Sequence, residues 1–185
     1  IKIIDQRLIP FELKIIELNT VDEVCFAIKE MQVRGAPLIG VTAAYGIYIA
    51  AREKVDLKEA SEKINATRPT AVNLSWALNK IMTSIKDIKK DELAIKILEL
   101  ANQIREEDIT NCHNIGKHGY KLIKEVYEKN NKPVNILTHC NAGWLATVDW
   151  GTALAPVFVA HKNNIPIHVW VDETRPRNQG FSLTS

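Results

Sequence analysis

The chain has 185 residues, of which 46% are apolar and 25% are charged, enough for one large or two small globular domains with a substantial core. Its 24 basic and 22 acidic side chains leave a net charge of only +2. This balance argues against nucleic acid as a partner and favours a small ligand that is neutral to anionic.

The three cysteines are widely spaced, at Cys25, Cys112 and Cys140, and no two of them form a C-x-x-C motif. This spacing argues against a disulfide framework and a structural zinc site, so we expect a reducing, cytoplasmic compartment and no metal. The longest stretch of small and apolar residues, Ala36 to Ala51, is shorter than a membrane span and contains Thr42. We therefore expect no membrane partner.

The first part of the chain predicts strands and then a helix. Residues 1–18 are rich in Ile and Leu, alternate loosely and are interrupted by Pro10, which indicates two short strands. A helix should follow Thr20, because Thr20 and Glu23 have the spacing of a capping box and apolar residues continue at helical spacing to Met31.

Several more helices are expected before residue 130. One should begin after Arg34-Gly35-Ala36, with a proline in its first turn and small residues that predict close packing. Another should follow the Arg68-Pro69-Thr70 loop, because the residue before a proline is held extended. Apolar spacing predicts two further helices, one through residues 93–104 and one through residues 109–126.

The pattern changes from Lys132 onward. An apolar strand leads to Cys140, a helix is expected from about Asn141 to Asn163, and a second apolar strand ends at Glu173. Such a βαβ unit predicts parallel strands whose carboxyl ends face the same crevice. We therefore expect an α/β chain with a mainly helical domain over residues 1–130 and a βαβ unit over residues 131–185.

Cys140 is the most informative candidate for chemistry. It lies where the first of these two strands ends and the following helix is expected to begin, and a helix amino terminus lowers the pKa of a thiol. A reactive thiolate is one interpretation of this position. A buried cysteine at the end of a strand is the other, since free cysteine is among the residue types most often buried.

Two arginines are candidates for binding an anion. Arg34-Gly35-Ala36 places a cation, a flexible glycine and a helix start together, as a phosphate or sugar hydroxyls would require. Arg68 precedes a helix in the same way. For each arginine a surface salt bridge is the simpler interpretation.

The histidine beside Cys140 does not indicate a Cys/His catalytic pair. Successive strand residues point to opposite faces, so we expect His139 to be a packed or hydrogen-bonded core histidine. The polar cluster from Asp172 to Arg175 ends the second strand, either at the crevice or as a structural ion network. Helical spacing places Cys112 on an apolar face, away from the histidines beside it, which argues against a metal site there.

The four tryptophans lie among apolar helix or strand positions, so we expect core residues and no stacking platform for a ligand. These are the residues Trp76, Trp144, Trp150 and Trp170.

Five motifs, in order, cover nearly the whole chain. They are RGAPLIGVTAAYG from Arg34, RPTAVNL from Arg68, THCNAG from Thr138, GTAL from Gly151 and DETRPRNQG from Asp172. In this combination the chain resembles the methylthioribose-1-phosphate isomerases. Their superfamily also contains ribose-1,5-bisphosphate isomerases and regulatory subunits of the exchange factor used in translation initiation. THCNAG followed by GTAL and DETRP favours the methylthioribose branch.

The resemblance implies a helical amino-terminal domain followed by a Rossmann-like parallel-sheet domain, in a homodimer that needs no cofactor. Cys140 matches the family's catalytic cysteine. The family's substrate-binding positions match Arg34, Gly35, Ala36, Arg68 and Gln179.

The family's second catalytic residue is an aspartate in a later strand, followed by Asn-Lys. No such residue is reached before Ser185, and Asp172 belongs to the DETRP motif. The chain also opens on Ile1 rather than Met and stops in a Gly/Ser/Thr stretch. We therefore expect a truncated chain that holds only the first part of the Rossmann-like domain.

The implied function is an aldose–ketose isomerase of methionine salvage that converts 5-methylthioribose 1-phosphate to 5-methylthioribulose 1-phosphate. The substrate's 5-deoxyribose analogue is a second candidate. Alternatives are a noncatalytic regulatory subunit of the translation initiation type and a ribose-1,5-bisphosphate isomerase. A thiol acyltransferase is disfavoured because no activating base accompanies Cys140.

Overall fold

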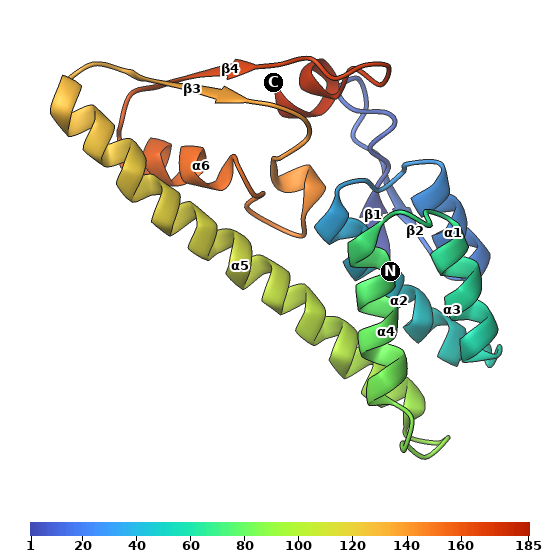
Figure 1. Ribbon diagram of the computed structural model, residues 1–185. Coiled ribbons are helices and arrows are strands. Elements are labelled where there is room, and N and C mark those ends of the chain that lie inside the picture. The colour runs from blue at the N-terminus through green and yellow to red at the C-terminus, as the bar shows by residue number, and fades with distance from the viewer. The chain divides into compact units, whose positions relative to one another are not determined.

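The computed structural model describes residues 1–185, which divide into two compact units. The amino-terminal unit is Ile1–Glu107 and the carboxyl-terminal unit is Asp108–Ser185. Figure 1 shows a helix-rich α/β chain with few and short strands. No helix combines the length and the apolar composition needed to cross a membrane. The division after residue 130 stays a prediction about domains.

Two short strands open the amino-terminal unit, as predicted. Strand β1 (Lys2–Ile4) pairs antiparallel with β2 (Ile15–Glu17), with Ile3 opposite Ile16. Helix α1 (Val21–Lys29) follows with the expected capping box: the Thr20 hydroxyl accepts from the Glu23 amide, and the Glu23 carboxylate accepts from the Thr20 amide. Both elements therefore confirm the sequence analysis.

Helix α2 (Ala36–Glu53) is the centre of this unit, and ten of its 18 residues are buried. A Cβ on Gly40 would lie 2.9 Å from the backbone oxygen of Asn73 in α4 (Val72–Ser84). One on Gly46 would lie within 2.9 Å of side-chain carbons of Val24 and Ile64. The small residues of α2 therefore bring its neighbours close, as the sequence predicted.

Helix α3 (Leu57–Ala66) was not among the predicted elements. Its start is marked by Asp56, whose side chain accepts a hydrogen bond from the Glu59 amide. An acidic cap ahead of a lysine- and glutamate-rich segment is the signal that would have revealed it.

Helix α5 (Leu93–Asn130) is a single element of 38 residues, so the prediction of two helices here is wrong. The gap between the two predicted helices contains Arg105 and three acidic residues but no glycine or proline. Charged residues interrupt the apolar pattern without interrupting the backbone, because all of them are compatible with a helix.

The carboxyl-terminal unit contains the predicted parallel pair. Strand β3 (Val134–Thr138) pairs with β4 (Ile167–Val171), with Val134 opposite Ile167 and Thr138 opposite Val171. The connection differs from the prediction of one helix over residues 141–163. It consists of a loop with a short 3-10 turn (Trp144–Ala146) and then helix α6 (Ala155–Lys162).

The loop departs from a helix because two glycines are used for close backbone approach. Gly151 has φ +78°, and a Cβ on it would lie 2.5 Å from the carbonyl carbon of Gly143. No other residue type fits that approach without displacing the backbone. In the helix predicted over residues 141–163 these glycines would only have weakened the backbone.

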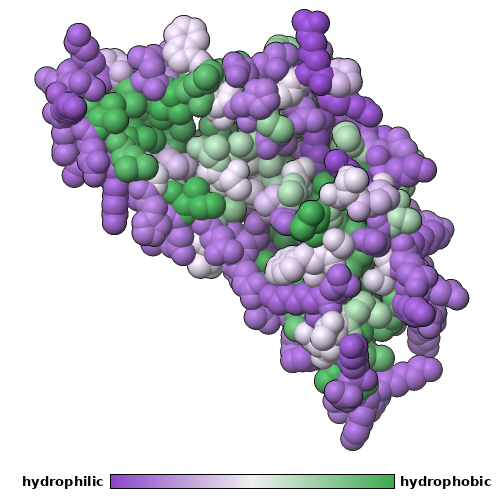
Figure 2. All heavy atoms as spheres, in the orientation of Figure 1, coloured by the Kyte–Doolittle hydropathy of each residue, from purple (hydrophilic) through white to green (hydrophobic).

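A small apolar cluster joins the sheet to the helices of this unit, with Val134, Ala160 and Ile165 at its centre and Ile136 and Ile167 beside it. In Figure 2, hydrophobic residues gather over the part of the unit where β3 and β4 run in Figure 1. Helix α6 packs closely on α5 because Gly119 of α5 has no side chain. A Cβ there would lie only 2.4 Å from the ring of Pro156 in α6.

The prediction of core tryptophans is wrong for three of the four. Trp76, Trp144 and Trp170 are exposed, and Trp150 is partly exposed and stacks on His113 at 4.8 Å between ring centroids. Apolar neighbours in sequence do not bury a side chain when the surrounding face has nothing packed on it.

Candidate active site

Cys140 lies two residues beyond the last residue of β3 and is exposed. Its backbone has φ +67°, and its carbonyl accepts a hydrogen bond from the Thr184 hydroxyl at 3.2 Å. The interpretation of a buried strand-end thiol is therefore excluded. The expected helix directly after Cys140 is absent, because α6 begins only at Ala155.

Hydrogen bonds hold the loop that follows Cys140. The Thr152 amide donates to the Ala142 carbonyl at 3.0 Å, and the Gly151 amide donates to the Thr147 hydroxyl at 3.1 Å. From α5, the Asp108 carboxylate accepts from the Val148 amide at 2.8 Å. The THCNAG and GTAL motifs, separated by seven residues in sequence, therefore form one connected piece of backbone beside the thiol.

Asp108, which is partly buried, and Cys112, which is buried, lie on the helix α5 that contacts this loop. Burial raises the pKa of the Asp108 carboxyl, and burial raises the pKa of the Cys112 thiol to about 11. A thiol with such a pKa stays protonated at neutral pH and does not serve as a nucleophile. The expected apolar position of Cys112 is confirmed by its burial.

His139 is not a core residue, so that prediction is wrong. Its side chain is 67% exposed, and its Nδ1 lies 3.4 Å from a carboxylate oxygen of Asp172. The alternation argument fails because β3 ends at Thr138 and the next residues leave the strand. Asp172 and His139 form a surface pair beside Cys140.

The DETRP cluster has a structural role that the sequence left open. The Glu173 carboxylate accepts hydrogen bonds from the amides of Thr174 and Gly180, at 2.7 and 2.9 Å. Gly180 must approach closely, since a Cβ there would lie 2.5 Å from the Asp172 carbonyl oxygen. Glu173 therefore fixes the backbone that places Gln179 at the start of the final helical turn (Gly180–Thr184).

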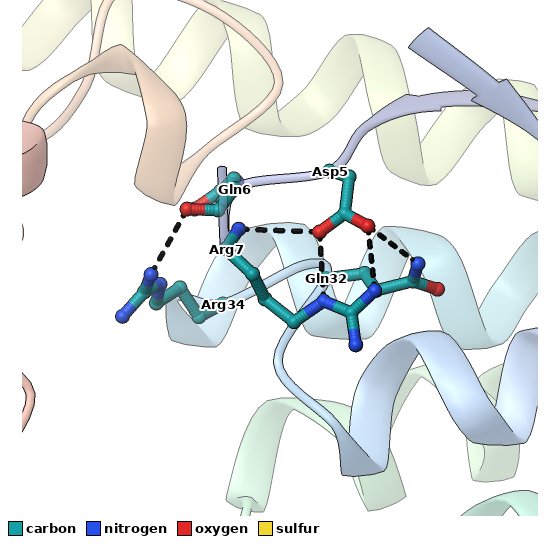
Figure 3. A network of polar contacts seen from close by, with 5 residues as sticks. All are labelled: Asp5, Gln6, Arg7, Gln32 and Arg34. Carbon is teal, nitrogen blue, oxygen red and sulfur yellow. Dashed lines mark hydrogen bonds and ion pairs between the residues drawn. The ribbon is translucent and has the colours of Figure 1, made fainter. Parts of the chain in front are cut away.

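Arg34 is a buried residue at the end of the segment that leads into α2. Only 8% of it is exposed, and its Nη2 donates to the backbone carbonyl of Gln6 at 3.1 Å (Figure 3). Gly35 follows with φ +101° as the cap of α2, and Ala36 begins the helix in an exposed position. No side chain caps α2, so its first amides remain available to a ligand.

A polar network that the sequence analysis missed supports this segment. Arg7 donates to both carboxylate oxygens of Asp5, at 2.9 and 2.7 Å, and the Gln32 amide donates to Asp5 at 2.7 Å (Figure 3). The hydrogen bond from Arg7 is the main reason that the pKa of Asp5 falls to about 2. The alternating charges of Asp5 and Arg7 were the available signal.

Arg68 lies in the predicted loop before α4 and is partly buried. Its carbonyl accepts from the Ala71 amide at 2.9 Å, which closes the turn containing Pro69. Gly40 in the second turn of α2 meets Asn73 in the first turn of α4, so the amino ends of these helices lie beside each other. The segments carrying Arg34 and Arg68 therefore lie at the same end of the amino-terminal unit.

The candidate residues thus form two groups, each within one unit. Arg34, Gly35, Ala36 and Arg68 belong to the amino-terminal unit, and Cys140 and Gln179 belong to the carboxyl-terminal unit. In the second group the final turn contacts Cys140 through Thr184. No three His, Cys, Asp or Glu side chains gather into a group that could hold a metal ion.

Known proteins match the chain over its whole length. A methylthioribose-1-phosphate isomerase of Methylorubrum populi is 50% identical over 188 residues, which cover 100% of this chain and 52% of the relative. One of Escherichia coli is 50% identical over 97% of this chain and 50% of the relative. The chain therefore spans about half the length of the curated relatives it matches.

Two solved structures resemble the fold. The 5-methylthioribose 1-phosphate isomerase of Pyrococcus horikoshii matches with a TM-score of 0.88 and 39% identity, over 99% of this chain and 52% of that one. The delta subunit of translation initiation factor eIF-2B from A. fulgidus matches with a TM-score of 0.80 and 39% identity, over 99% and 55%.

The family profile decides the classification. It is described as the initiation factor 2 subunit family and matches residues 32–185, from the segment before α2 to the final turn. This range includes every candidate residue named above, and both solved relatives bear names that belong to the superfamily predicted from the motifs. The chain belongs to the initiation factor 2 subunit family.

Proposed function

We propose that the protein isomerises 5-methylthioribose 1-phosphate to 5-methylthioribulose 1-phosphate in methionine salvage, as a cytoplasmic homodimer. The observation that carries the proposal is the 50% identity, along the whole chain, to proteins named methylthioribose-1-phosphate isomerase. The exposed thiol of Cys140 at the carboxyl end of a parallel strand agrees with it, because ligands of α/β folds bind at that edge.

The reaction sets clear chemical demands. The anomeric oxygen carries the phosphate, so the ring opens only when an acid protonates the ring oxygen. Hydrogen then moves from carbon 2 to carbon 1, either as a hydride or through an enol phosphate ester, which forms when the proton on carbon 2 is removed. Return of a proton to carbon 1 and loss of the enol proton leave a ketone at carbon 2. The sulfur of Cys140 takes or stabilises the carbon 2 proton, and the resemblance assigns the acid to an aspartate that is not among these residues.

Substrate binding is assigned to Arg34, Gly35, Ala36, Arg68 and Gln179. Gly35 and Ala36 present the uncapped start of the 18-residue helix α2, where amides and the helix dipole favour an anion. The guanidinium groups supply fixed positive charge for the phosphate ester. Glu173 holds the backbone on either side of Gln179.

A noncatalytic regulatory subunit is the second candidate, because the delta subunit from A. fulgidus matches with a TM-score of 0.80. Such a subunit has no need of a reactive thiol or of substrate-binding arginines. Ribose 1,5-bisphosphate and 5-deoxyribose 1-phosphate are the competing substrates if the protein is an isomerase.

The test is an isomerase assay with all three sugar phosphates. It uses the 185-residue chain and a chimera in which the part of the Methylorubrum populi relative beyond the match is joined to it. Replacing Cys140 with Ala should lower kcat about 100-fold to 10,000-fold and leave substrate affinity nearly unchanged, since only proton transfer is lost. Cys25→Ala, which removes a partly buried thiol from α1, should retain full activity.

Two results would contradict the proposal in different ways. If Cys140→Ala retained nearly full turnover, Cys140 would have no part in the chemistry, but the isomerase function would still stand. Folded protein that turns over none of the three substrates in either form would overturn the isomerase and favour the regulatory subunit.

A further inference from the structure

Four buried polar atoms without a hydrogen-bond partner belong to residues at or just beyond the ends of β3 and β4, the segment that carries Cys140 among them. They are the Thr138 hydroxyl, both side-chain amide atoms of Asn141 and the Thr174 hydroxyl. Thr138 is only 5% exposed. An unpaired buried polar group costs about 1 to 3 kcal/mol, so a group of four needs an explanation.

These residues come from the carboxyl ends of the two parallel strands. Thr138 is the last residue of β3 and lies opposite Val171 of β4. Its carbonyl accepts from the Asp172 amide at 3.0 Å, which joins the segment of Thr174 to that of Asn141. Asn141 directly follows the exposed Cys140, so its amide belongs to the edge where the thiol lies.

The hydrogen-bonding groups of the Asn141 side-chain amide limit the kinds of ligand group that it can bind. Asn141 offers an N–H₂ donor and a carbonyl acceptor, and both lack a partner. A phosphate group at neutral pH only accepts hydrogen bonds and would leave the acceptor unpaired. A methylthio group would leave the donor unpaired as well. Two neighbouring sugar hydroxyls satisfy both, because one accepts from the amide nitrogen while the other donates to the amide oxygen.

We propose that Asn141 is a substrate-positioning residue that holds the two ring hydroxyls of the sugar and so places carbon 2 at the Cys140 thiol. The inference rests on the proposed isomerase function. The Thr138 hydroxyl, buried beneath the same edge, adds a further hydrogen bond to the bound sugar or to a water molecule that accompanies it. The amide is kept unpaired in the unliganded protein because the substrate completes its bonds.

The test removes the amide and the hydroxyl separately and together. kcat/KM is measured for Asn141→Ala with 5-methylthioribose 1-phosphate and with its 3-deoxy analogue, in the form of the protein that is active in the isomerase assay. We expect a loss of about 10-fold to 100-fold with the parent substrate. With the 3-deoxy analogue, which cannot form both bonds, the loss should be less than about threefold.

A matched control and a stability measurement separate binding from structure. Asn135→Ala removes an exposed amide of β3 that already accepts from the Trp170 indole at 3.1 Å, and it should not change kcat/KM. Thr138→Val removes a buried, unpaired hydroxyl at constant volume, so its Tm should equal or exceed that of the unchanged chain, with a smaller loss of kcat/KM.

Each outcome decides the matter. Equal losses on both substrates, or a Tm lowered by several degrees in both Asn141→Ala and Thr138→Val, would show that these groups support the fold only. An unchanged kcat/KM in Asn141→Ala would remove the residue from the site. Both results leave the isomerase function standing, whereas absence of turnover in the unchanged protein overturns that function and this inference with it.

Discussion

The two units of the chain are stabilised in different ways. In the amino-terminal unit, α1, α3 and α4 surround α2, and residues such as Val24, Ile47 and Ile64 are fully buried. In the carboxyl-terminal unit the sheet has two strands, and Leu137 and Trp170 on it are exposed. Around Cys140, hydrogen bonds to loops are added to a smaller set of buried apolar side chains such as Leu145 and Leu154.

This difference separates stability from chemistry. An apolar core tolerates few polar groups without partners, whereas a loop region held by single hydrogen bonds can leave polar atoms for a ligand. The unpartnered hydroxyl of Thr138 and amide of Asn141 lie in the second kind of region. We expect substitutions in the first unit to change the free energy of unfolding most and substitutions near Cys140 to change activity most.

The largest effect on stability should come from truncating the centre of α2. Ile47 is 0% exposed, so Ile47→Ala should lower the free energy of unfolding of its unit by about 3 kcal/mol through lost apolar burial and a cavity. The matched change Leu137→Ala in β3 should cost less than about 0.5 kcal/mol, because that side chain is 68% exposed. Hydrogen exchange of amides in each unit measures the two effects separately.

Similar losses for the two variants would break the comparison. They would mean that the face of β3 carrying Leu137 is covered in solution.

The features that could be predicted from the sequence are those that local signals or general rules determine. Helices α1, α2 and α4 were predicted because local signals such as the Thr20–Glu23 capping box agree with their packing. The parallel pairing of β3 and β4 followed from a general rule of chain connection. The family motifs led to the correct family, and they were recognised as patterns without any account of their geometry.

The remaining features depend on contacts between distant residues. The loop over residues 141–154 was predicted as a helix because the contact between Gly151 and Gly143 cannot be seen in a linear pattern. The exposure of His139 and Trp170 depends on what packs on the sheet, which alternation does not report. The lack of partners for the Asn141 amide is likewise a property of its surroundings alone.

The second effect concerns the acid stability of the amino-terminal unit. Hydrogen bonds from Arg7 lower the pKa of Asp5 from 3.8 to about 2, so the folded state favours the ionised carboxylate. Its contribution, roughly 2 kcal/mol, is present above pH 4 and lost as the pH falls towards 2. Asp5→Asn should therefore destabilise this unit at pH 6 and make it less sensitive to acid. Urea denaturation at pH 6 and at pH 2.5, followed by hydrogen exchange of α2 amides, tests this expectation.

The smallest predicted effect on stability concerns Asp108, and its pH dependence is opposite to that of Asp5. Burial raises the pKa of Asp108 in the carboxyl-terminal unit above its ordinary value, so the protonated carboxyl favours the folded state. The stability that this preference contributes is complete below the ordinary pKa and is lost as the pH rises through the raised pKa. Asp108→Asn retains an oxygen that accepts from the Val148 amide and removes the buried charge. At pH 7 the variant should be slightly more stable to unfolding than the unchanged chain, and at pH 3 this difference should vanish. Equal changes at both pH values would mean that only the hydrogen bond to Val148 matters, and that this buried carboxylate imposes no electrostatic cost on the loop beside Cys140.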